Sequence, residues 1–567
     1  MTLPRFAALA AASILLTAAK APEDRTIRYK VTPLAPGGWG NALRVEMRFR
    51  GDADGETTLV LPSEWAGSTE LWRHVTDLKI RGASRAAGAN GAPVIHHRPG
   101  AAIRVRYDLV SAWPDEPGFA YEKARPLIAR DHFFVHGEGL FAAPGGRQEK
   151  NARFRWGRIP KGWTVASDLD HLGGEKTSVA NLINSVVIAG KGMAVVERRI
   201  GRAPLRVAVN GKWNFTPEQL ADMVAKVVAA ENDFWGEEAT PFLVAMAPLG
   251  EVPAGLSYTG TGRADAFTIA STSAFELKQA TRFLGHEYMH SWVPIALGNM
   301  PEDEASDYWF SEGFNDYLAS KVLLRAGLWT LEQWAADKNE TLLRYGTSSA
   351  KTVAGAQVGA RFWSDPAVQQ VSYDRGHLLA AVLDAEIAEK SAGAQSLDTV
   401  LRAQKKAAVG SSTMAAELFR ATLMEKTGID AAPWIERYAR TGEAVVLPAA
   451  LLGACGTVVT ERRHAFDRGY DAQATRVADG VIAGVDPAGA AYLAGLRDGM
   501  RLIRREAGTI GDSSAPLSYR VADGAEEKVI SYLPVGRTEH EVQRIVLAPG
   551  SEEQSRACAA RLGGVKG

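Results

Sequence analysis

Two stretches near the N-terminus alternate strictly between apolar and charged residues. Apolar side chains occupy every second position from Leu43 to Phe49 and from Ile103 to Leu109, and the positions between them are charged. A period of two places the apolar residues on one face of a sheet, as in half-buried strands. The region 22–205 therefore predicts an N-terminal domain of the β-sandwich type.

The pattern changes after residue 205. The sequence Thr-Pro-Glu-Gln at 216–219 combines an N-cap, a proline at the first helical position and a capping-box glutamine, so it predicts a helix start. Apolar runs at 242–246 and 267–270 predict strands, and leucine and alanine stripes from 327 to about 443 predict helices. Residues 206–450 thus predict a small β-rich lobe followed by a helical lobe.

Length and charge limit the classes of protein to consider. A chain of 567 residues is too long for one core and predicts about three or four domains. Its 65 basic residues balance 65 acidic ones without a long block of like charge, which argues against nucleic acid or an anionic membrane as the main partner. The two cysteines, Cys455 and Cys558, either close a disulfide in an oxidising compartment or remain unpaired thiols.

Residues 1–21 carry the features of a secretory signal peptide. Arg5 precedes an apolar run that ends at Ala18, and Ala-Lys-Ala at 19–21 forms a cleavage site. The alternative is an uncleaved anchor, but the run is shorter than the ~20 residues that a membrane span needs. We therefore expect an exported protein, periplasmic or secreted, without an integral membrane domain.

Four histidines of the predicted β domain invite a metal interpretation. They are His96, His97, His132 and His136, and none has a carboxylate or cysteine partner at ligand spacing. We expect them to be solvated residues at strand ends.

The strongest chemical signal is His-Glu-Tyr-Met-His at 286–290. Positions i and i+4 share one face of a helix, so His286 and His290 can bind one metal ion with Glu287 beside it as general base. Ser273 and Glu276 form a capping-box pair that predicts the start of a helix of about twenty residues around the motif. The alternative is a pair of core or solvated histidines that fall at this spacing by accident.

A catalytic zinc ion takes three protein ligands, so a third must come from elsewhere in the chain. Glu312 follows at a distance that leaves room for a turn and a second helix, with Asp307 as its N-cap. Asp316 is i+4 from Glu312 and is placed to orient a ligand histidine. The competing ligands are the acids of the connection, Glu302, Asp303 and Glu304.

Three segments resemble those of one peptidase family. They are His-Glu-Tyr-Met-His-Ser-Trp at 286–292, Trp-Phe-Ser-Glu-Gly-Phe at 309–314 and Ser-Tyr-Asp-Arg-Gly at 372–376. They resemble the M61 glycyl aminopeptidases, which are gluzincins with a thermolysin-like catalytic domain. The resemblance implies a Zn²⁺-dependent peptidase acting on peptides or proteins, with His286, His290 and Glu312 as ligands and Tyr373 as the donor that stabilises the oxyanion.

One segment departs from that family. Its aminopeptidases carry a glutamate that binds the substrate's free α-amine, and the matching stretch here, Gly255-Leu256-Ser257-Tyr258, has Ser257 in its place. A hydroxyl cannot supply the charge that pairs with an ammonium group. The choice between exopeptidase and endopeptidase therefore stays open.

The last segment, 451–567, resembles a PDZ domain. The resemblance rests on Val-Asp-Pro-Ala at 485–488 and Ala-Gly-Leu-Arg-Asp-Gly at 494–499. M61 peptidases commonly carry such a domain at this position, and PDZ domains capture peptide C-termini by strand addition. The alternative is a packing domain that binds nothing.

Two other functions stay open beside the zinc peptidase: a catalytically silent binding protein, and a zinc hydrolase of a non-peptide bond. A complete ligand set with Glu287 argues against the silent protein. The predicted fold class is multidomain α+β, with an N-terminal β-sandwich-like domain (22–205), a thermolysin-like α/β catalytic domain with a helical lobe (206–450) and a C-terminal PDZ-like domain (451–567).

Overall fold

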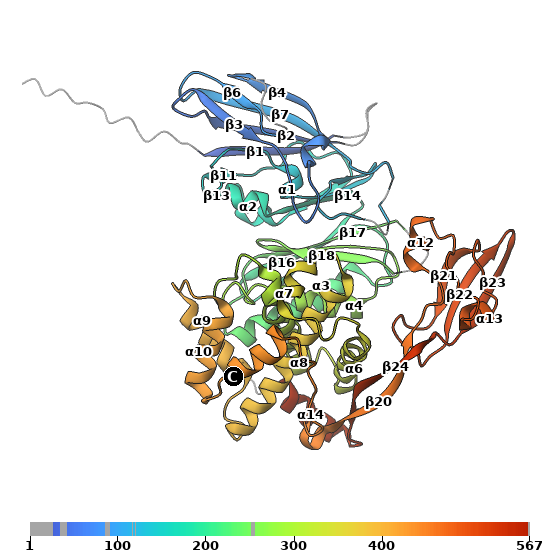
Figure 1. Ribbon diagram of the computed structural model, residues 1–567. Coiled ribbons are helices and arrows are strands. Elements are labelled where there is room, and N and C mark those ends of the chain that lie inside the picture. Colours follow the sequence, from blue (N-terminus) through green and yellow to red (C-terminus); the bar gives the residue numbers. More distant parts are fainter. Residues whose placement is uncertain are drawn as a thin grey trace, which may run out of the picture.

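The structure is a computed structural model that describes residues 26–34, 42–85, 91–115, 117–118, 121–250 and 256–564 (Figure 1). The predicted signal peptide, 1–21, lies outside the described residues. In Figure 1 a β-rich N-terminal domain lies above a domain of sheet and helices, and a C-terminal β-rich extension projects to one side. Within the described ranges, no helix combines the length and apolarity that a membrane crossing requires.

The N-terminal domain has two main sheets that share one apolar core. The outer sheet has the strand order β13-β11-β1-β2-β7-β4, and the inner sheet the order β12-β14-β9-β8. The alternation predicted at 43–49 and 103–109 is confirmed, because the apolar residues of β2 and β7 are buried and the charged ones lie on the opposite face. The outer strands are β1 (Ile27–Leu34), β2 (Ala42–Arg50), β4 (Val75–Arg81), β7 (Ala102–Val110), β11 (Asn151–Arg153) and β13 (Thr177–Ser178). The inner strands are β8 (Leu127–Ile128), β9 (His132–His136), β12 (Trp163–Ser167) and β14 (Val186–Lys191). A smaller sheet contains β3 (Glu56–Val60), β5 (Ser84–Arg85), β6 (Val94–His96) and β10 (Ala143–Pro144).

Two of the four histidines expected at solvated strand ends are instead buried. His132 and His136 belong to β9 and are 3% and 2% exposed. β9 lies inside the molecule because both faces of the inner sheet are covered. His136 is satisfied there by the carbonyl of Lys123 and the hydroxyl of Thr268, at 2.8 and 3.1 Å.

The sheet of the predicted catalytic domain, called the catalytic sheet below, lies directly below the inner sheet. Its strand order is β15-β16-β17-β19-β18, and apolar residues of β14 and β17 fill the space between the two sheets. The strands are β15 (Ala194–Ile200), β16 (Ala203–Val209), β17 (Phe242–Pro248), β18 (Tyr258–Gly262) and β19 (Ala266–Ser271). The two predicted strands, 242–246 and 267–270, are confirmed as β17 and β19. The domain boundary predicted at 205/206 falls within β16.

Helices cover the lower side of this sheet. The predicted start at 216–219 is confirmed: helix α3 (Pro217–Trp235) begins at Pro217, and Thr216 and Gln219 form a reciprocal capping box. The helical lobe, also predicted, follows in the yellow to orange part of Figure 1. Its main helices are α4 (Leu277–Met289), α5 (Asn315–Arg325), α6 (Leu331–Thr347), α7 (Gly355–Arg361), α8 (Pro366–Lys390), α9 (Leu397–Ala408) and α10 (Ala415–Thr427).

The C-terminal segment divides into two parts. Strands β21 (Arg501–Ala507), β22 (Leu517–Asp523) and β23 (Glu526–Tyr532) form a sheet with its own small core. The long ribbon of β20 (Gly456–Phe466) and β24 (Val535–Leu547) connects it to α6, and helix α14 (Glu552–Gly563) packs on α5. Cys455 and Cys558 form a disulfide that ties α14 to the start of the ribbon. The chain beyond residue 450 therefore returns to the predicted catalytic domain.

Candidate metal centre

Helix α4 carries two of the three candidate ligands. Its buried residues, including Ala280, Leu284 and Met289, pack toward α3 and α5, which fixes the helix in the core. His286 is buried on this helix and His290 is its C-terminal cap. The helix begins at Leu277 with Glu276 as N-cap, so the predicted capping box of Ser273 and Glu276 is wrong.

A tertiary contact explains that correction. Phe275 is fully buried and packs against Tyr258 of β18, with ring centroids 5.0 Å apart. The chain makes a turn there, in which the N–H of Phe275 donates to the carbonyl of Thr272. Burying this ring therefore delays the helix by one turn.

Glu312 lies in a π-helical turn, η4 (Trp309–Phe314), which leads directly into α5. Asp307 ends a preceding 3₁₀ turn, η3 (Glu304–Asp307), so its predicted role as N-cap is wrong. Gly313 of η4 lies against Gly376 of α8 so closely that neither position has room for a Cβ atom. This glycine contact lets η4 pack on α8 with the wider turn. Such turns are rare and often mark functional sites.

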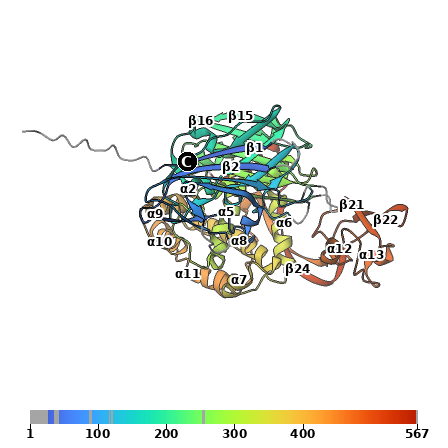
Figure 2. The same cartoon turned by 90° about the horizontal axis from the view of Figure 1, so that it is seen from above.

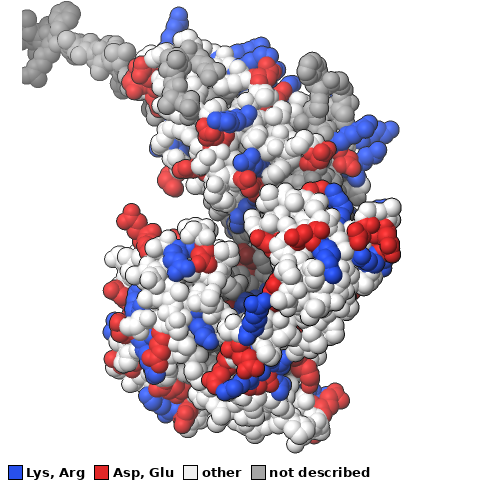
Figure 3. Space-filling model, turned by 45° about the vertical axis from the view of Figure 1, so that its right-hand side comes forward, with Lys and Arg blue, Asp and Glu red and all other residues white. Residues whose placement is uncertain are grey.

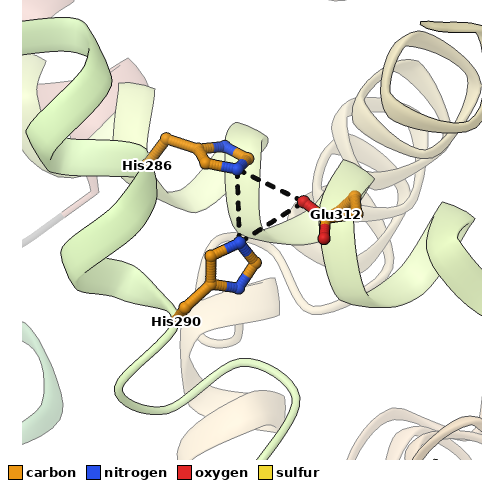
Figure 4. A group of neighbouring side chains, drawn as sticks. All are labelled: His286, His290 and Glu312. Atoms are coloured by element: carbon orange, nitrogen blue, oxygen red, sulfur yellow. Dashed lines mark hydrogen bonds and ion pairs between the residues drawn. The ribbon is translucent and has the colours of Figure 1, made fainter. Parts of the chain in front are cut away.

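Three acceptor atoms converge between α4 and η4 (Figure 4). The Nε2 atoms of His286 and His290 are 3.2 Å apart, and they lie 3.2 and 3.3 Å from Oε2 of Glu312. Four-coordinate zinc has ligands at ~2.0–2.2 Å, which places tetrahedral donors about 3.3 Å from one another. The triangle has the dimensions that a tetrahedral zinc ion requires. Among the described residues, His286, His290 and Glu312 form the one group whose His, Cys or carboxylate atoms all lie within 4.8 Å of one another.

Hydrogen bonds at Nδ1 of both histidines leave their Nε2 atoms facing the triangle. Nδ1 of His286 donates to Oδ1 of Asp316 at 2.9 Å, and Nδ1 of His290 donates to the carbonyl of Val293 at 2.8 Å. A neutral imidazole that donates from Nδ1 keeps a lone pair on Nε2. Oε2 of Glu312 is buried and has no hydrogen-bond donor. Three lone pairs face one another, and a metal cation satisfies all of them.

Protons compete with a metal for this site. Burial disfavours the charged form of His286, but the carboxylates of Asp316 and Glu312 outweigh it and raise its pKa to about 10. Burial likewise opposes the charge of Glu312, yet the two imidazoles lower its pKa overall. Metal binding would therefore release a proton from the histidines.

Asp316 is held by more than one partner. Besides His286, it accepts from Nη2 of Arg282 at 2.6 Å and from Nδ1 of His377 at 3.2 Å. Burial and the ammonium group of Lys338 lower the pKa of His377 to about 4, which leaves this imidazole neutral. The carboxylate thus has one fixed position from which it orients His286.

The competing acids do not reach the triangle. Glu302, Asp303 and Glu304 are exposed on the connection before η4, and they are absent from the described cluster of metal-binding atoms. Glu287 is half-buried on α4, adjacent to His286. Tyr373 lies within α8 and its ring stacks on the His286 ring, with centroids 5.9 Å apart. Burial, followed by the charges of Glu312 and Glu287, raises the pKa of Tyr373 well above its usual value, so the phenol stays a donor.

The edge of the catalytic sheet borders the same site. Gly255 lies outside the described residues. Leu256 is partly buried against the core, and Ser257 precedes β18, where its backbone pairs with Thr272. The aromatic ring of Phe283, one turn before Glu287 on α4, contacts β18 at Tyr258. The predicted substrate segment therefore lies alongside the helix that carries the motif.

Three residues near the centre were missed from the sequence. Arg282 and His377 hold Asp316, and Nζ of Lys123 lies 3.4 Å from the carbonyl oxygen of Gly260 in β18. Arg282 stands one turn before His286 on α4, a spacing that was available as a signal. His377 and Lys123 had none, because only the fold brings them close to α4.

A comparison with models of protein families finds a match in this chain. The family model of the M61 glycyl aminopeptidases matches residues 279–376, which contain both histidines, Glu287, Glu312 and Tyr373. Over this segment the chain is similar to the M61 peptidase family. No match is found among curated protein sequences.

A comparison with solved structures finds proteins of similar fold. An aminopeptidase N family protein from Idiomarina loihiensis aligns with a TM-score of 0.67 at 16% identity, over 94% of this chain and 100% of its own. An M1 zinc metallopeptidase from Deinococcus radiodurans aligns with a TM-score of 0.41 at 14% identity, over 75% of this chain and 94% of its own. The first similarity shows that the two proteins share one overall fold over nearly the whole length of this chain.

Proposed function

We propose that this chain is a zinc-dependent peptidase that hydrolyses peptide bonds at the site between α4 and η4. The observation that carries the proposal is the triangle of His286, His290 and Glu312, three lone pairs spaced for zinc within an M61 segment. Bound zinc would lower the pKa of a coordinated water toward neutrality and polarise the substrate carbonyl.

The residues around the triangle have separate tasks. Glu287 takes the proton of the attacking water and delivers it to the leaving amine. Tyr373 donates a hydrogen bond to the oxyanion, since its phenol remains protonated. Asp316 and the carbonyl of Val293 keep both imidazoles in the tautomer that presents Nε2 to the metal.

The edge of the sheet at β18 gives no advantage to substrates with a free α-amine. Ser257 offers no negative charge, and the cation of Lys123 lies three residues further along the same edge. In an antiparallel pair, every second residue of a strand bonds to the same neighbour, and Ser257 and Arg263 bond to β19 or its extensions. Gly260 belongs to the other set of residues, so its carbonyl faces the open edge, where Lys123 contacts it. A cation there repels an ammonium group. We therefore propose that internal bonds and blocked peptides are cleaved as readily as free N-termini.

We also propose export and a peptide-binding role for the C-terminal sheet. The disulfide between Cys455 and Cys558 is of a kind that persists in oxidising compartments, which agrees with the signal-peptide features at 1–21. The sheet of β21, β22 and β23 has a core of its own, and strand addition to it would present a peptide C-terminus.

One experiment separates the three functions. Metal content is measured for wild type and Glu312→Ala, and both are given a mixed peptide library with free or acetylated N-termini. We expect one zinc per wild-type chain, far less in the variant, and cleavage of both peptide classes. Zinc without peptide cleavage would favour a non-peptide substrate, and absence of both would favour the silent binding protein. Unchanged zinc in Glu312→Ala would refute Glu312 as the ligand.

A further inference from the structure

The outer sheet of the N-terminal domain aligns five arginines in one row across five neighbouring strands. Arg28 of β1 pairs with Arg153 of β11 on one side and with Arg48 of β2 on the other. Arg48 pairs with Arg104 of β7, and Arg104 pairs with Arg81 of β4. We call these five residues the arginine row. With strands ~4.8 Å apart, the row spans about 19 Å.

The row is exposed, and four of its five residues have no ion-pair partner among the described residues. All five side chains belong to the exposed class and lie opposite the buried apolar face of their strands. No carboxylate of the described residues lies within 4.0 Å of the guanidinium of Arg48, Arg81, Arg104 or Arg153. Like charges directly opposite one another destabilise a sheet, so the fold maintains this arrangement at a cost.

The two rows that follow on the same face contain carboxylates. In the next row Lys30 pairs with Glu46, while Lys79 and Arg106 share Asp77. In the row after that, Arg44 makes a bidentate pair with Asp108 at 2.7 and 2.8 Å. Carboxylates thus offset part of the positive charge in these two rows, whereas the arginine row itself contains no carboxylate.

One end of the arginine row borders a hollow in the surface. Its volume is about 260 Å³, and its lining includes Arg28, Arg48, Arg153 and Arg155. Only one carboxylate, Glu46, lies among the lining residues, and it is already paired with Lys30. An anion in the hollow can contact several guanidinium groups at once. Each guanidinium group can donate two parallel hydrogen bonds to a phosphate.

The row lies on the far side of the domain from the metal centre. The inner sheet separates the outer sheet from the catalytic sheet, with one apolar core above it and another below. Figure 2, which looks down on the N-terminal domain, shows β1 and β2 crossing the near face. A ligand on this face does not contact the peptidase site.

We propose that the arginine row is a binding site for a linear phosphate polymer, which lies across the strands with one end in the hollow. A line of charge fits a chain of anionic groups. A flat membrane surface would also cover the two rows that follow on one side, where carboxylates offset part of the charge and repel anionic headgroups. Bound to such a polymer, the peptidase would be held in place with its catalytic cleft facing away.

The test measures binding of inorganic polyphosphate of uniform length to the full chain at several salt concentrations. The variant Arg48→Gln/Arg81→Gln/Arg104→Gln removes three charges of the row. The control Arg462→Gln/Arg501→Gln/Arg504→Gln removes three exposed charges from β20 and β21. We expect the row variant to bind at least ~10-fold more weakly and its salt slope to fall by about 2, since each phosphate contact adds about 0.7–0.9. The control should stay within about twofold of wild type.

Peptidase activity shows that both variants are folded, because neither set of residues lies near the metal centre. Equal losses in the row variant and the control would overturn the proposal, as would no binding by wild type at low salt. Orthophosphate that competes as well as polyphosphate at equal phosphate would reduce the site to a single-anion pocket. Binding of anionic vesicles or polyglutamate in preference to polyphosphate would assign the row to a membrane or an acidic peptide and refute the polymer.

Discussion

The candidate metal centre gathers three electron-pair donors in the core, and the arginine row gathers five cations on the surface. The two differ in how their side chains are paired. In the metal centre three lone pairs meet in the core, and each group behind them is paired: His286 with Asp316, and Asp316 with Arg282. In the row, four of the five guanidinium groups have no ion-pair partner within the described part of the chain.

Burial and solvent exposure explain how each set of side chains tolerates its unbalanced charge. Burial makes an uncompensated acceptor expensive, and under the proposed function a metal cation supplies the charge that the interior triangle lacks. Water and salt screen the exposed row, so the fold tolerates it without a ligand. The surface elsewhere mixes both signs of charge, as the visible face in Figure 3 shows. The arginine row therefore differs from the surrounding surface, because strand register aligns arginines there without an acidic neighbour in the row.

The largest effect should come from removing the base at the metal centre. Glu287→Gln should keep zinc and fold yet lower kcat by about 10²–10⁴, because no other group takes the water's proton. The measurement is peptidase turnover with metal content in parallel. Glu276→Gln, at the exposed start of the same helix, is the matched control and should leave turnover unchanged. Activity of Glu287→Gln within a few-fold of wild type would exclude the mechanism.

Removing the oxyanion donor should have the next largest effect. Tyr373→Phe should lower kcat by about 10²–10³ with little change in KM, because the phenol acts when charge develops on oxygen. Steady-state kinetics separate the two constants. A change confined to KM would place Tyr373 in substrate binding instead. Tyr438→Phe, a buried tyrosine of the helical lobe, controls for the loss of a hydroxyl.

Weakening the support of a ligand should lower metal affinity and leave the ligand set intact. Asp316→Asn should reduce zinc affinity by about 10–100-fold, since the amide holds His286 less firmly in its tautomer. Competition with a chelator measures this affinity. Asp337→Asn removes another partner of Arg282, at 2.9 Å, but touches neither histidine, so it should keep the wild-type affinity. Equal losses in both variants would assign the effect to Arg282.

The substrate edge should respond to charge more than to size. Ser257→Glu should shift preference several-fold toward peptides with a free N-terminus, because charge-assisted hydrogen bonds are roughly twice as strong as neutral ones. Cleavage of matched free and acetylated peptides gives the ratio. Ser257→Gln adds similar bulk without charge and should not shift it. Wild type that acts on free N-termini alone would require another acid as the amine anchor.

The smallest effect should be a gain in stability at the arginine row. Arg48 lies between Arg28 and Arg104, so Arg48→Gln should raise the free energy of unfolding by a few tenths of a kcal/mol at low salt. The gain should vanish at high salt through screening. Arg44→Gln, on the same strand but paired with Asp108, should lower stability instead. Thermal unfolding at two salt concentrations checks both signs, and a loss in Arg48→Gln would show that the row is compensated.

The sequence by itself determined the features that depend on local backbone geometry. The spacing of His286 and His290 places both on one helix face wherever the helix lies, and the cap at Thr216 was correct because all its bonds join near neighbours. The alternation in β2 and β7 likewise gave the buried face of each strand. It also showed that alternate arginines face outward, but not which arginines of different strands would be neighbours.

Only the tertiary structure decided the rest. Burial of Phe275 moved the start of α4, and the contact of Gly313 with Gly376 set Glu312 in a π-helical turn. The arginine row exists through strand register alone, in a chain whose charges balance overall. Register and packing depend on contacts between residues far apart in the chain, and the spacing of residues along one segment does not specify them.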